Sequence, residues 1–594
     1  MTTATALEAL LTGSDAFEPA ELAALDEREE FPARAARALD EAGLAAHYIL
    51  SRGSETPNGE TPNGETPNGN TPNGNSSDRN ASDGVTSDGD TPHGGLPETV
   101  RLLRAVARRD LTVAIAHGKT FLGSVPVWIA GTPEQSAALA GRVLAGDTVC
   151  WGLTERGHGA DLLAGEFSAT ALDGDGLAGD GRNGDGRNGG ELGGGWRLDG
   201  EKWLINNATR SALACVLART DPAGGARGFS LFLVDKKALP EGSWRPLPKV
   251  RTHGIRGADI SGFALDRAEI PAGALIGEEG GGLPVVLKSL QLTRITCVSL
   301  SLGATDHALR LAREFAAGRE LYGRRLSAVP HVRRALGRAA AQALTAEAVT
   351  LLSTRSVHTL PGELSVVSAL TKAFVPSLVQ RTLTGIGELL GVRGFLTSPP
   401  GGGFAKLERD HRIVSIFDGS TTVNRAALIS QLPRLGRQLA KGRTDAEGLR
   451  TAADLTAPLP AFDPARLALL SPTGCSAVQA LPEAVERAAL PFPSRLLDGL
   501  ATDASALVPA TGGLPSTAFA LAERYEHAYA AAACLLLWLE NPPLRTGRLG
   551  KDALWLRACL AALADEDDTE AYDALADVLL DRSAPEFTLL EATV

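Results

Sequence analysis

Long helical segments dominate the stretch of sequence from Leu283 to about Leu435. Helical patterning covers residues 283–316, 329–355, 363–390 and 420–435, and glycine, proline or polar residues separate these segments. Helices of this length have an apolar face that leaves water only by packing against another element. The pattern therefore predicts a four-helix bundle, which constrains the fold more than any other feature of the chain.

A series of short β-prone runs precedes the bundle. FSATAL, GWRLDGEKWLI, ALACVLART, GFSLFLVD and SGFALDRAEI lie within residues 150–270, and turn residues separate them. Helical patterning also covers residues 15–50 and 96–145, and it resumes from Ala465 to the end. The predicted fold class is α+β, with an N-terminal helical domain (1–149), a β-barrel or sandwich domain (150–270), a helical bundle (271–435), a polar linker (436–464) and an extra helical extension (465–594).

Two low-complexity tracts interrupt these domains. Residues 55–74 are tandem five-residue units, ETPNG three times and then NTPNG, and DGDGLAGDGRNGDGRNGGELGGG spans residues 173–195. Such sequences bury almost no apolar surface and cannot offset the entropy lost on ordering. We expect a disordered surface insertion over residues 51–95 and an enlarged, disordered loop over residues 173–195.

Composition and charge limit the possible partners. The net charge of −12 and the lack of a long basic run argue against nucleic acid. No apolar run reaches the roughly 18 residues of a membrane span, and the early acidic residues argue against a signal peptide. The six cysteines never form a CxxC pair, which predicts reduced thiols and no metal site. We expect a cytoplasmic protein that stays out of membranes.

A turn between an apolar strip and a helix start is the first candidate for chemistry. The segment from Glu408 to Arg425 reads ERDHRIVSIFDGSTTVNR, and Asp418 lies at its centre. Gly419 allows close approach of a ligand or a positive φ, and hydroxyl residues suit the start of the following helix. An acid in this setting is a candidate for a desolvated general base. A helix-capping aspartate explains the same pattern.

This segment resembles the catalytic segment of acyl-CoA dehydrogenases. In that family an Arg-Asp pair, here Arg409-Asp410, precedes a Tyr-Glu-Gly-Thr turn that carries the catalytic base. Phe417-Asp418-Gly419-Ser420 occupies the turn here, so aspartate stands where the family usually has glutamate. The resemblance implies that Asp418 is the base, that Gly419 lies at the substrate, and that Ser420 and Thr422 contact the cofactor.

A glycine-rich cluster between Trp151 and Asp161 reads WGLTERGHGAD. Taken alone, it suits an ordinary loop as well as a ligand site. It is similar to the family's Thr-Glu-Pro-Gly-Ala-Gly-Ser-Asp segment, which lines the flavin and its pyrophosphate. Here Arg156 replaces the proline and Ala160 replaces the serine. The resemblance implies that the cofactor is contacted by Trp151, Leu153, Thr154, Gly159 and Ala160, and that Ala160 also contacts the substrate.

The run DGEKWLINN, from Asp199 to Asn207, follows a tight turn and suits a plain amphipathic strand. It is similar to the family pattern Asn-Gly-x-Lys-x-Trp-Ile-Thr-Asn, whose tryptophan packs on the flavin and whose threonine donates toward N5. Leu204 and Asn206 hold those two positions here. Leucine covers a ring without aromatic stacking, and Asn206 retains a hydrogen-bond donor. Both are implied to contact the cofactor.

Two further clusters lie in the helical bundle. RELYGR, which begins at Arg319, resembles Arg-x-Thr-Phe-Gly-Lys, whose arginine reaches the diphosphate of a neighbouring subunit's cofactor. ELLGVRGF, which begins at Glu388, resembles Gln-x-Leu-Gly-Gly-x-Gly-Phe, which meets the adenosine side. An exposed basic helix end and a helix terminus with glycine explain the same residues. The resemblance implies cofactor contacts from Arg319, Tyr322, Glu388 and Gly391.

The pair Thr293-Arg294 matches the Thr-Arg of the helix that faces the base in this family. Both residues are implied to bind substrate. Some family members carry their catalytic glutamate on this helix, but Thr293 holds that position here. Asp418 is therefore the candidate base. The resemblances follow the family's order across about residues 15–435.

The resemblance implies FAD-dependent α,β-dehydrogenation of an acyl thioester, which is carried by CoA or by an acyl carrier protein. Asp418 would remove the α-proton while the hydride passes to flavin N5, and an electron-transfer flavoprotein or another acceptor would reoxidise the flavin. A flavin monooxygenase of the same fold and a non-catalytic dehydrogenase-like subunit are the alternatives. Residues 465–594 resemble the helical extension of very-long-chain acyl-CoA dehydrogenases, which implies a homodimer.

Overall fold

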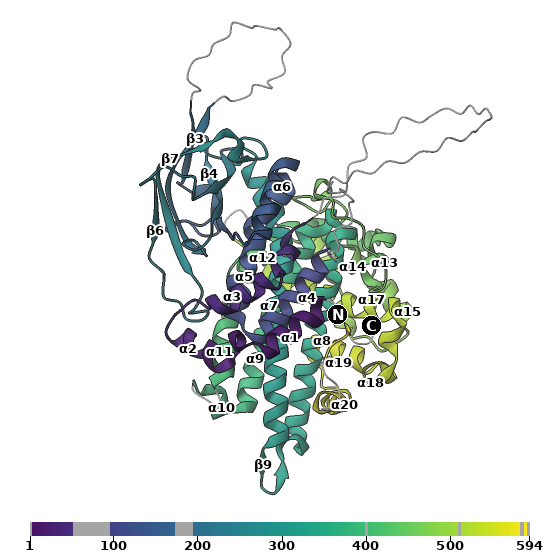
Figure 1. Ribbon diagram of the computed structural model, residues 1–594. Coiled ribbons are helices and arrows are strands. Elements are labelled where there is room, and N and C mark those ends of the chain that lie inside the picture. The colour runs from purple at the N-terminus through teal and green to yellow at the C-terminus, as the bar shows by residue number, and fades with distance from the viewer. Residues whose placement is uncertain are drawn as a thin grey trace, which may run out of the picture.

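The computed structural model describes residues 3–50, 95–172, 194–397, 402–508, 513–581 and 587–590. The insertion expected over residues 51–95 and the loop expected over residues 173–195 lie outside these ranges, apart from the glycines at their ends. Within the described residues, a helical body carries a β domain at one end (Figure 1).

The β domain is a sheet with the strand order β6-β7-β3-β2-β4-β5-β8, and β1 pairs with β4. β3 and β7 form a long antiparallel pair, whereas β1 runs parallel to β4. Trp196 packs against Phe232 with ring centroids 5.1 Å apart, inside a core of the domain's own. The strands are β1 (Val149–Gly152), β2 (Ser168–Ala171), β3 (Gly195–Asn206), β4 (Leu213–Arg219), β5 (Phe229–Asp235), β6 (Trp244–Leu247), β7 (Ile260–Pro271) and β8 (Leu275–Ile276).

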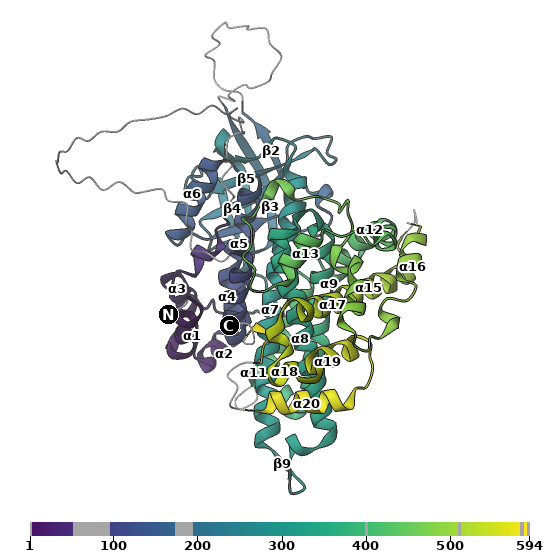
Figure 2. The ribbon, with the colours of Figure 1, turned by 90° about the vertical axis from the view of Figure 1, so that its right-hand side faces the viewer.

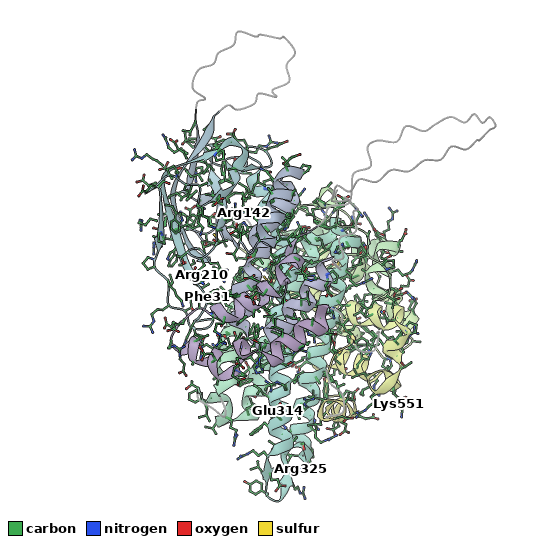
Figure 3. The ribbon with its side chains drawn as sticks, in the orientation of Figure 1. Phe31, Arg142, Arg210, Glu314, Arg325 and Lys551 are labelled. Atoms are coloured by element: carbon green, nitrogen blue, oxygen red, sulfur yellow. The ribbon has the colours of Figure 1, made fainter. Side chains whose placement is uncertain are left out.

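The N-terminal helices lie beside the bundle. They are α1 (Thr3–Gly13), α2 (Pro19–Glu27), α3 (Ala33–Glu41), α4 (Gly95–Arg109), α5 (Leu111–Ala130) and α6 (Pro133–Leu144). Thr132 and Gln135 form a capping box at the start of α6, as the sequence signals there predict. Arg210 of the β domain lies over the ring of Phe31, with its Cζ 3.8 Å from the centroid (Figure 3), and this contact joins the two domains.

The predicted bundle is formed by α7 (Gly282–Gly318), α8 (Pro330–Thr359), α9 (Leu364–Leu390) and α12 (Thr421–Lys441). These bounds agree with the predicted segments except at the end of α12. A short hairpin, β9 (Glu320–Leu321) and β10 (Arg324–Arg325), joins α7 to α8. The smaller helices α10 (Val392–Phe395) and α11 (Gly402–His411) precede the turn that contains Asp418.

The expectation of a polar linker over residues 436–464 is only partly correct. α12 continues to Lys441, and α13 (Ala446–Ala453) follows after a short break. Leu449, Ala452 and Ala453 of α13 are buried, and α13 packs against α8. Burial of this short apolar face stabilises a helix that is too short to give a clear periodic signal.

The helical extension packs against α8, on the side of the bundle away from the N-terminal helices (Figure 2). Arg425 of α12 donates to Glu526 of α17, at 2.8 and 3.0 Å. Ser353 of α8 lies 3.0 Å from the hydroxyl of Tyr529. The helices are α14 (Ser476–Gln479), α15 (Leu481–Ala488), α16 (Leu500–Ala506), α17 (Ser516–Glu540), α18 (Gly547–Gly550), α19 (Leu554–Leu563) and α20 (Thr569–Leu580).

Three segments of the described chain are long and apolar enough to cross a membrane by length and composition alone. They are Leu111–Ala130, Gly282–Gly318 and Pro361–Leu390. In each, at least 83% of the most apolar stretch is buried inside the protein. The sequence expectation counted only unbroken apolar runs and so did not identify them.

Candidate functional site

The turn that contains Asp418 has an unusual backbone. Asp418 has φ 54° and Gly419 has φ 93°, so both lie in the left-handed region. Aspartate is among the residues that tolerate this region best, and glycine enters it without steric cost. Ser420 is the N-cap of α12, and its side chain accepts a hydrogen bond from the N–H of Val423. The turn therefore directs the Asp418 side chain away from the helix that it precedes.

Two buried cations hold the carbonyl groups of this turn. The Nζ of Lys372 donates to the carbonyl oxygens of Val414 at 2.7 Å and Phe417 at 2.8 Å. The Nε of Arg294 donates to the carbonyl oxygen of Asp418 at 3.1 Å. Burial lowers the pKa of Lys372 to about 8 and that of Arg294 to about 10, although the Asp418 carboxylate opposes both shifts. Both cations are thus desolvated, with backbone carbonyls as their hydrogen-bond acceptors.

An amide completes the support of the turn. The Nδ2 of Asn424, on the first turn of α12, donates to the carbonyl oxygens of Gly419 at 2.8 Å and Ser420 at 3.0 Å. Asn424 is fully buried. The strained backbone is therefore fixed by side chains from α7, α9 and α12, and this is how left-handed residues persist at functional sites.

The Asp418 carboxylate points toward α5 and α7. Its side chain is 10% exposed. Oδ2 lies 3.3 Å from the Nζ of Lys119 and 2.9 Å from the Sγ of Cys297. Oδ1 makes no hydrogen bond within the described part of the chain. Burial, together with the Asp418 charge, raises the pKa of the Cys297 thiol well above its usual range, so the thiol donates to Oδ2.

Lys119 and Cys297, which contact this carboxylate, also line a small apolar pocket. It has a volume of about 20 Å³, and its walls come from α4, α5, α7 and Phe417. Ile115 and Leu122 line one side and Leu300 lines another. A space of this size holds about one water molecule. A larger cavity of about 1130 Å³ lies near the C-terminal end of α5, and it contains none of the predicted site residues.

One face of the β domain carries unpaired polar groups. The Nε1 of Trp151 and both polar atoms of the Asn206 side chain are buried, and none has a hydrogen-bond partner within the described residues. Leu204, at φ 59°, is 46% exposed. Buried polar groups are nearly always hydrogen-bonded, and an exposed leucine beside them offers an apolar surface. These features fit a flavin that packs on Leu204 and hydrogen-bonds to Asn206.

α5 links this face to the turn. The Nδ2 of Asn207, which directly follows β3, donates to the carbonyl oxygen of Ala116 at 2.7 Å. Lys119, which contacts Asp418, lies one helical turn further along α5. Residues three apart lie on the same side of a helix. The structure therefore brings the predicted flavin face and the predicted base to one helix.

The remaining predicted residues of the glycine-rich cluster lie in a loop that is held against β3. The Thr154 hydroxyl donates to the carbonyl oxygen of Trp203 at 2.7 Å, which holds the cluster against β3. Leu153 is half-buried, and Gly159 and Ala160 are exposed. A buried ion pair not predicted from the sequence, Lys202–Glu155 at 2.8 Å, fixes the same loop.

Other predicted residues lie close to the turn without facing the pocket. The Thr293 side chain is fully buried, and its hydroxyl contacts the carbonyl oxygen of Leu290 at 3.5 Å. Ser420 uses its hydroxyl as a helix cap, and Thr422 is exposed. Arg294 is the predicted substrate residue that the structure places on Asp418 itself.

A second group of predicted residues lies far from the turn. Arg319, Tyr322, Glu388 and Gly391 are all exposed. They lie at the β9–β10 hairpin and at the junction of α9 with α10, and the hairpin is at the end of the bundle opposite the sheet (Figure 1). Figure 3 shows Arg325 of the same hairpin at this end. Arg294 and Arg319 are separated by most of the length of α7, about 38 Å at 1.5 Å per residue. One chain therefore does not bring these residues to its own Asp418.

The Arg-Asp pair before the turn joins domains. Asp410 is fully buried, and it accepts hydrogen bonds from the N–H of Ile255 at 2.6 Å and the Nζ of Lys406 at 2.7 Å. Arg409 forms an ion pair with Asp26 of α2. The pair thus connects α11 with the β domain and the N-terminal helices, next to the segment that carries Asp418.

Sequence reasoning missed Lys119, Cys297, Lys372 and Asn424. Two of them left a signal. Lys119 and Lys372 are each the only lysine in a strongly apolar helix, α5 and α9. A lysine in such a position must find a partner to leave water. The partners lie about 300 and 45 residues away along the chain, so periodicity within a segment gives no means to identify them.

Comparisons with known proteins agree with this architecture. Residues 150–268 match the family model of the acyl-CoA dehydrogenase middle domain, and residues 280–432 match that of the C-terminal domain. The probable acyl-CoA dehydrogenase FadE25 of Mycobacterium tuberculosis is 26% identical over 57% of this chain and 80% of its own length.

Solved structures share the fold. Butyryl-CoA dehydrogenase from Megasphaera elsdenii superposes with a TM-score of 0.57 and 20% identity, over 73% of this chain and 98% of that chain. An acyl-CoA dehydrogenase from Bacillus anthracis, complexed with FAD, has a TM-score of 0.62 and 17% identity. It covers 97% of this chain and 87% of its own, so its match extends over the extra helices. By these matches the chain contains the middle and C-terminal domains of the acyl-CoA dehydrogenase family, whose members are FAD-dependent oxidoreductases.

Proposed function

We propose that this protein desaturates an acyl thioester between its α and β carbons, with Asp418 as the base. The observation that carries the proposal is the setting of the Asp418 carboxylate. It is 10% exposed, and Oδ2 is already hydrogen-bonded. Its neighbours Lys119, Cys297 and Phe417 line an apolar pocket between α5 and α7. Oδ1 is left to accept a proton.

The chain's own residues bind and orient the reacting groups. Leu204, Asn206 and Trp151 would hold FAD, which supplies an acceptor for the hydride from the β carbon. The backbone N–H of Asp418 donates to no acceptor in the described chain. It is available to stabilise the oxygen of a thioester enolate as the α-proton leaves. Arg294 and Lys372 hold the turn so that this N–H and the carboxylate keep one relative orientation.

Aspartate at position 418, where the family usually has glutamate, has a physical consequence. Its carboxylate is shorter than that of glutamate by roughly one carbon–carbon bond, and a misplacement near 1 Å can cost on the order of 100-fold in rate. The fixed backbone of the turn and the hydrogen bonds to Oδ2 limit such misplacement. These contacts favour a catalytic role for Asp418 over a non-catalytic subunit.

The test is the pair Asp418→Asn and Asp418→Ala. Both should retain a yellow flavin spectrum and lose on the order of 10²–10⁴ of the rate of flavin bleaching by acyl-CoA substrates, as expected for loss of a general base. A panel of straight and branched acyl-CoAs, with the same acyl groups on an acyl carrier protein, identifies the carrier.

Two outcomes would reject the proposal. Substantial bleaching with Asp418→Ala would remove Asp418 from the mechanism. Steady oxygen uptake that depends on an added NAD(P)H flavin reductase, without desaturation, would identify a monooxygenase of the same fold. Once bleaching is established, the rate at which an electron-transfer flavoprotein reoxidises the reduced flavin is compared with the rate in oxygen. The faster reaction identifies the acceptor.

We also propose a homodimer in which each chain completes the cofactor site of the other. The support is the separation along α7 between Arg294 and Arg319, together with the exposed apolar side chains at that end. Tyr322 is fully exposed, and Phe395 is 85% exposed. Large exposed aromatic residues beside arginines favour a surface that contacts another chain or a ligand.

A further inference from the structure

α5 carries one lysine in a mostly apolar and buried helix. Lys119 is the only lysine or arginine between Leu111 and Ala130, and its side chain is 14% exposed. An ammonium group taken out of water is costly unless a charged or hydrogen-bonding partner compensates. The partner of Lys119 therefore shows what the residue does.

Within the described part of the chain, Lys119 has two partners, and both belong to the turn. Its Nζ lies 3.3 Å from Oδ2 of Asp418 and 3.9 Å above the ring centroid of Phe417. The first contact is an ion pair and the second is a cation–π contact. The lysine is thus fixed by the residue before the base and by the base itself.

The other charged and titratable groups around the carboxylate differ in what they contact. Arg294 of α7 and Lys372 of α9 donate to backbone carbonyls of the turn. Cys297 of α7 donates its thiol to Oδ2. Among the described residues, Lys119 is the one cation that forms an ion pair with the Asp418 carboxylate.

We infer that Lys119 is the positioning residue of the base: its ion pair fixes Oδ2 of Asp418 and leaves Oδ1 without a hydrogen bond within the described residues. The inference rests on the proposed function of Asp418. It adds to that function a means by which a short aspartate side chain is kept in one rotamer beside a fixed positive charge.

The first experiment compares the pH dependence of kcat/KM for wild type and Lys119→Met, with the acyl-CoA that the wild type desaturates fastest. An opposite charge within about 4–6 Å favours the ionised form of a carboxylate, by roughly 1–3 pH units. Removal of the charge should move the acid limb of the profile upward by about one pH unit. The pH-independent rate should fall on the order of 10-fold or more as the carboxylate loses its fixed orientation.

Lys119→Arg and Lys237→Met are the matched controls. Lys119→Arg keeps the charge, so its acid limb should lie within a few tenths of a pH unit of the wild-type limb. A purely structural role for Lys119 does not predict this recovery. Lys237 lies on the β domain with 74% of its side chain exposed, and Lys237→Met should leave the profile unchanged. Lys119→Gln replaces Lys119→Met if the latter does not give soluble protein, and the same upward shift is expected.

A second readout does not depend on turnover. The difference between the infrared spectra of wild type and Asp418→Asn, followed against pH, gives the protonation of the Asp418 carboxyl directly. The same comparison is then made between Lys119→Met and the double variant. The Asp418 signal is expected at higher pH there than in wild type. An unchanged titration and an unchanged acid limb would overturn the role of Lys119, even with Asp418 confirmed as the base. If Lys119→Met loses activity only with acyl groups that carry a second carboxylate, Lys119 binds substrate and the positioning role is overturned. Full turnover by Asp418→Asn would instead overturn the proposed function.

Discussion

Asp418 combines a left-handed backbone with a buried charge, and neighbouring side chains offset both costs. Lys372, Arg294 and Asn424 bond to the carbonyl oxygens around it, and Lys119 pairs with its carboxylate. Each of these groups would be left unsatisfied and buried if the turn moved, at about 1–3 kcal/mol for each unmade hydrogen bond. The same contacts that stabilise the fold therefore fix the geometry of the proposed base.

His411, seven residues before Asp418, predicts how the stability of the fold depends on pH. Its ring nitrogens lie 2.9 Å from Ser301 Oγ and 2.9 Å from Gln380 Oε1. Burial and the nearby Lys372 lower its pKa to about 3. The unfolded chain binds the proton more readily, at a pKa of about 6.5. The stabilising contribution is therefore complete above pH 6.5 and is lost as the pH falls toward 3.

The variant His411→Gln isolates this contribution. Between pH 7.5 and pH 5.5, the free energy of unfolding of wild type should fall by about 1.4 kcal/mol more than that of the variant, because one titrating group is absent from the latter. Urea unfolding at the two pH values measures the difference. Equal losses in the two proteins would show that folding does not lower the pKa of His411.

At the scale of elements, the sequence predicted the helices whose apolar residues repeat with helical spacing within one segment. The bounds of α7, α8 and α9 agree with prediction to within a few residues because each helix has many turns over which its pattern repeats. α13 was missed because eight residues provide only about two turns. The candidate base was found from a local motif, whereas Lys119 and Lys372 come from other helices and only the fold brings them to Asp418.

The attachment of the extension to the bundle depends on a glycine. A Cβ at Gly337 of α8 would lie 1.8 Å from the carbonyl oxygen of Tyr572 on α20. Gly337→Ala must therefore separate the two helices, and we expect a cost of about 1–3 kcal/mol from the overpacking. Hydrogen exchange should show loss of protection over α20 before the rest of the protein.

Gly385→Ala is the matched control for this prediction. Gly385 lies in α9, is exposed, and would have no atom within 4 Å of an added Cβ. Alanine is favoured over glycine inside a helix by about 0.8–1 kcal/mol, so this variant should be neutral or stabilising. If both variants have equal effects, the close approach of α8 and α20 is not what holds the extension.

At the scale of the whole molecule, the predicted cofactor residues divide into two groups. Trp151, Leu204 and Asn206 lie at the β domain, beside α5. Arg319 and Glu388 lie at the other end of helices α7 and α9, which run rigidly between the two. A rigid helix of this length does not bend to close such a distance, so the second group acts at a different cofactor site or at none.

Mixed dimers of two inactive variants distinguish these possibilities. Arg319→Ala should lose FAD affinity, and Asp418→Asn should lose its base. In a heterodimer, the Arg319→Ala chain keeps Asp418 and receives an intact Arg319 from its partner, so one site is complete. Co-expression with two affinity tags should therefore recover up to about half of the wild-type rate per dimer, by the closed two-fold symmetry of such an assembly. If Arg319 served its own chain, both sites of the heterodimer would be defective and no activity would return. A monomer by sedimentation at micromolar concentration, with FAD bound, would contradict the shared site directly.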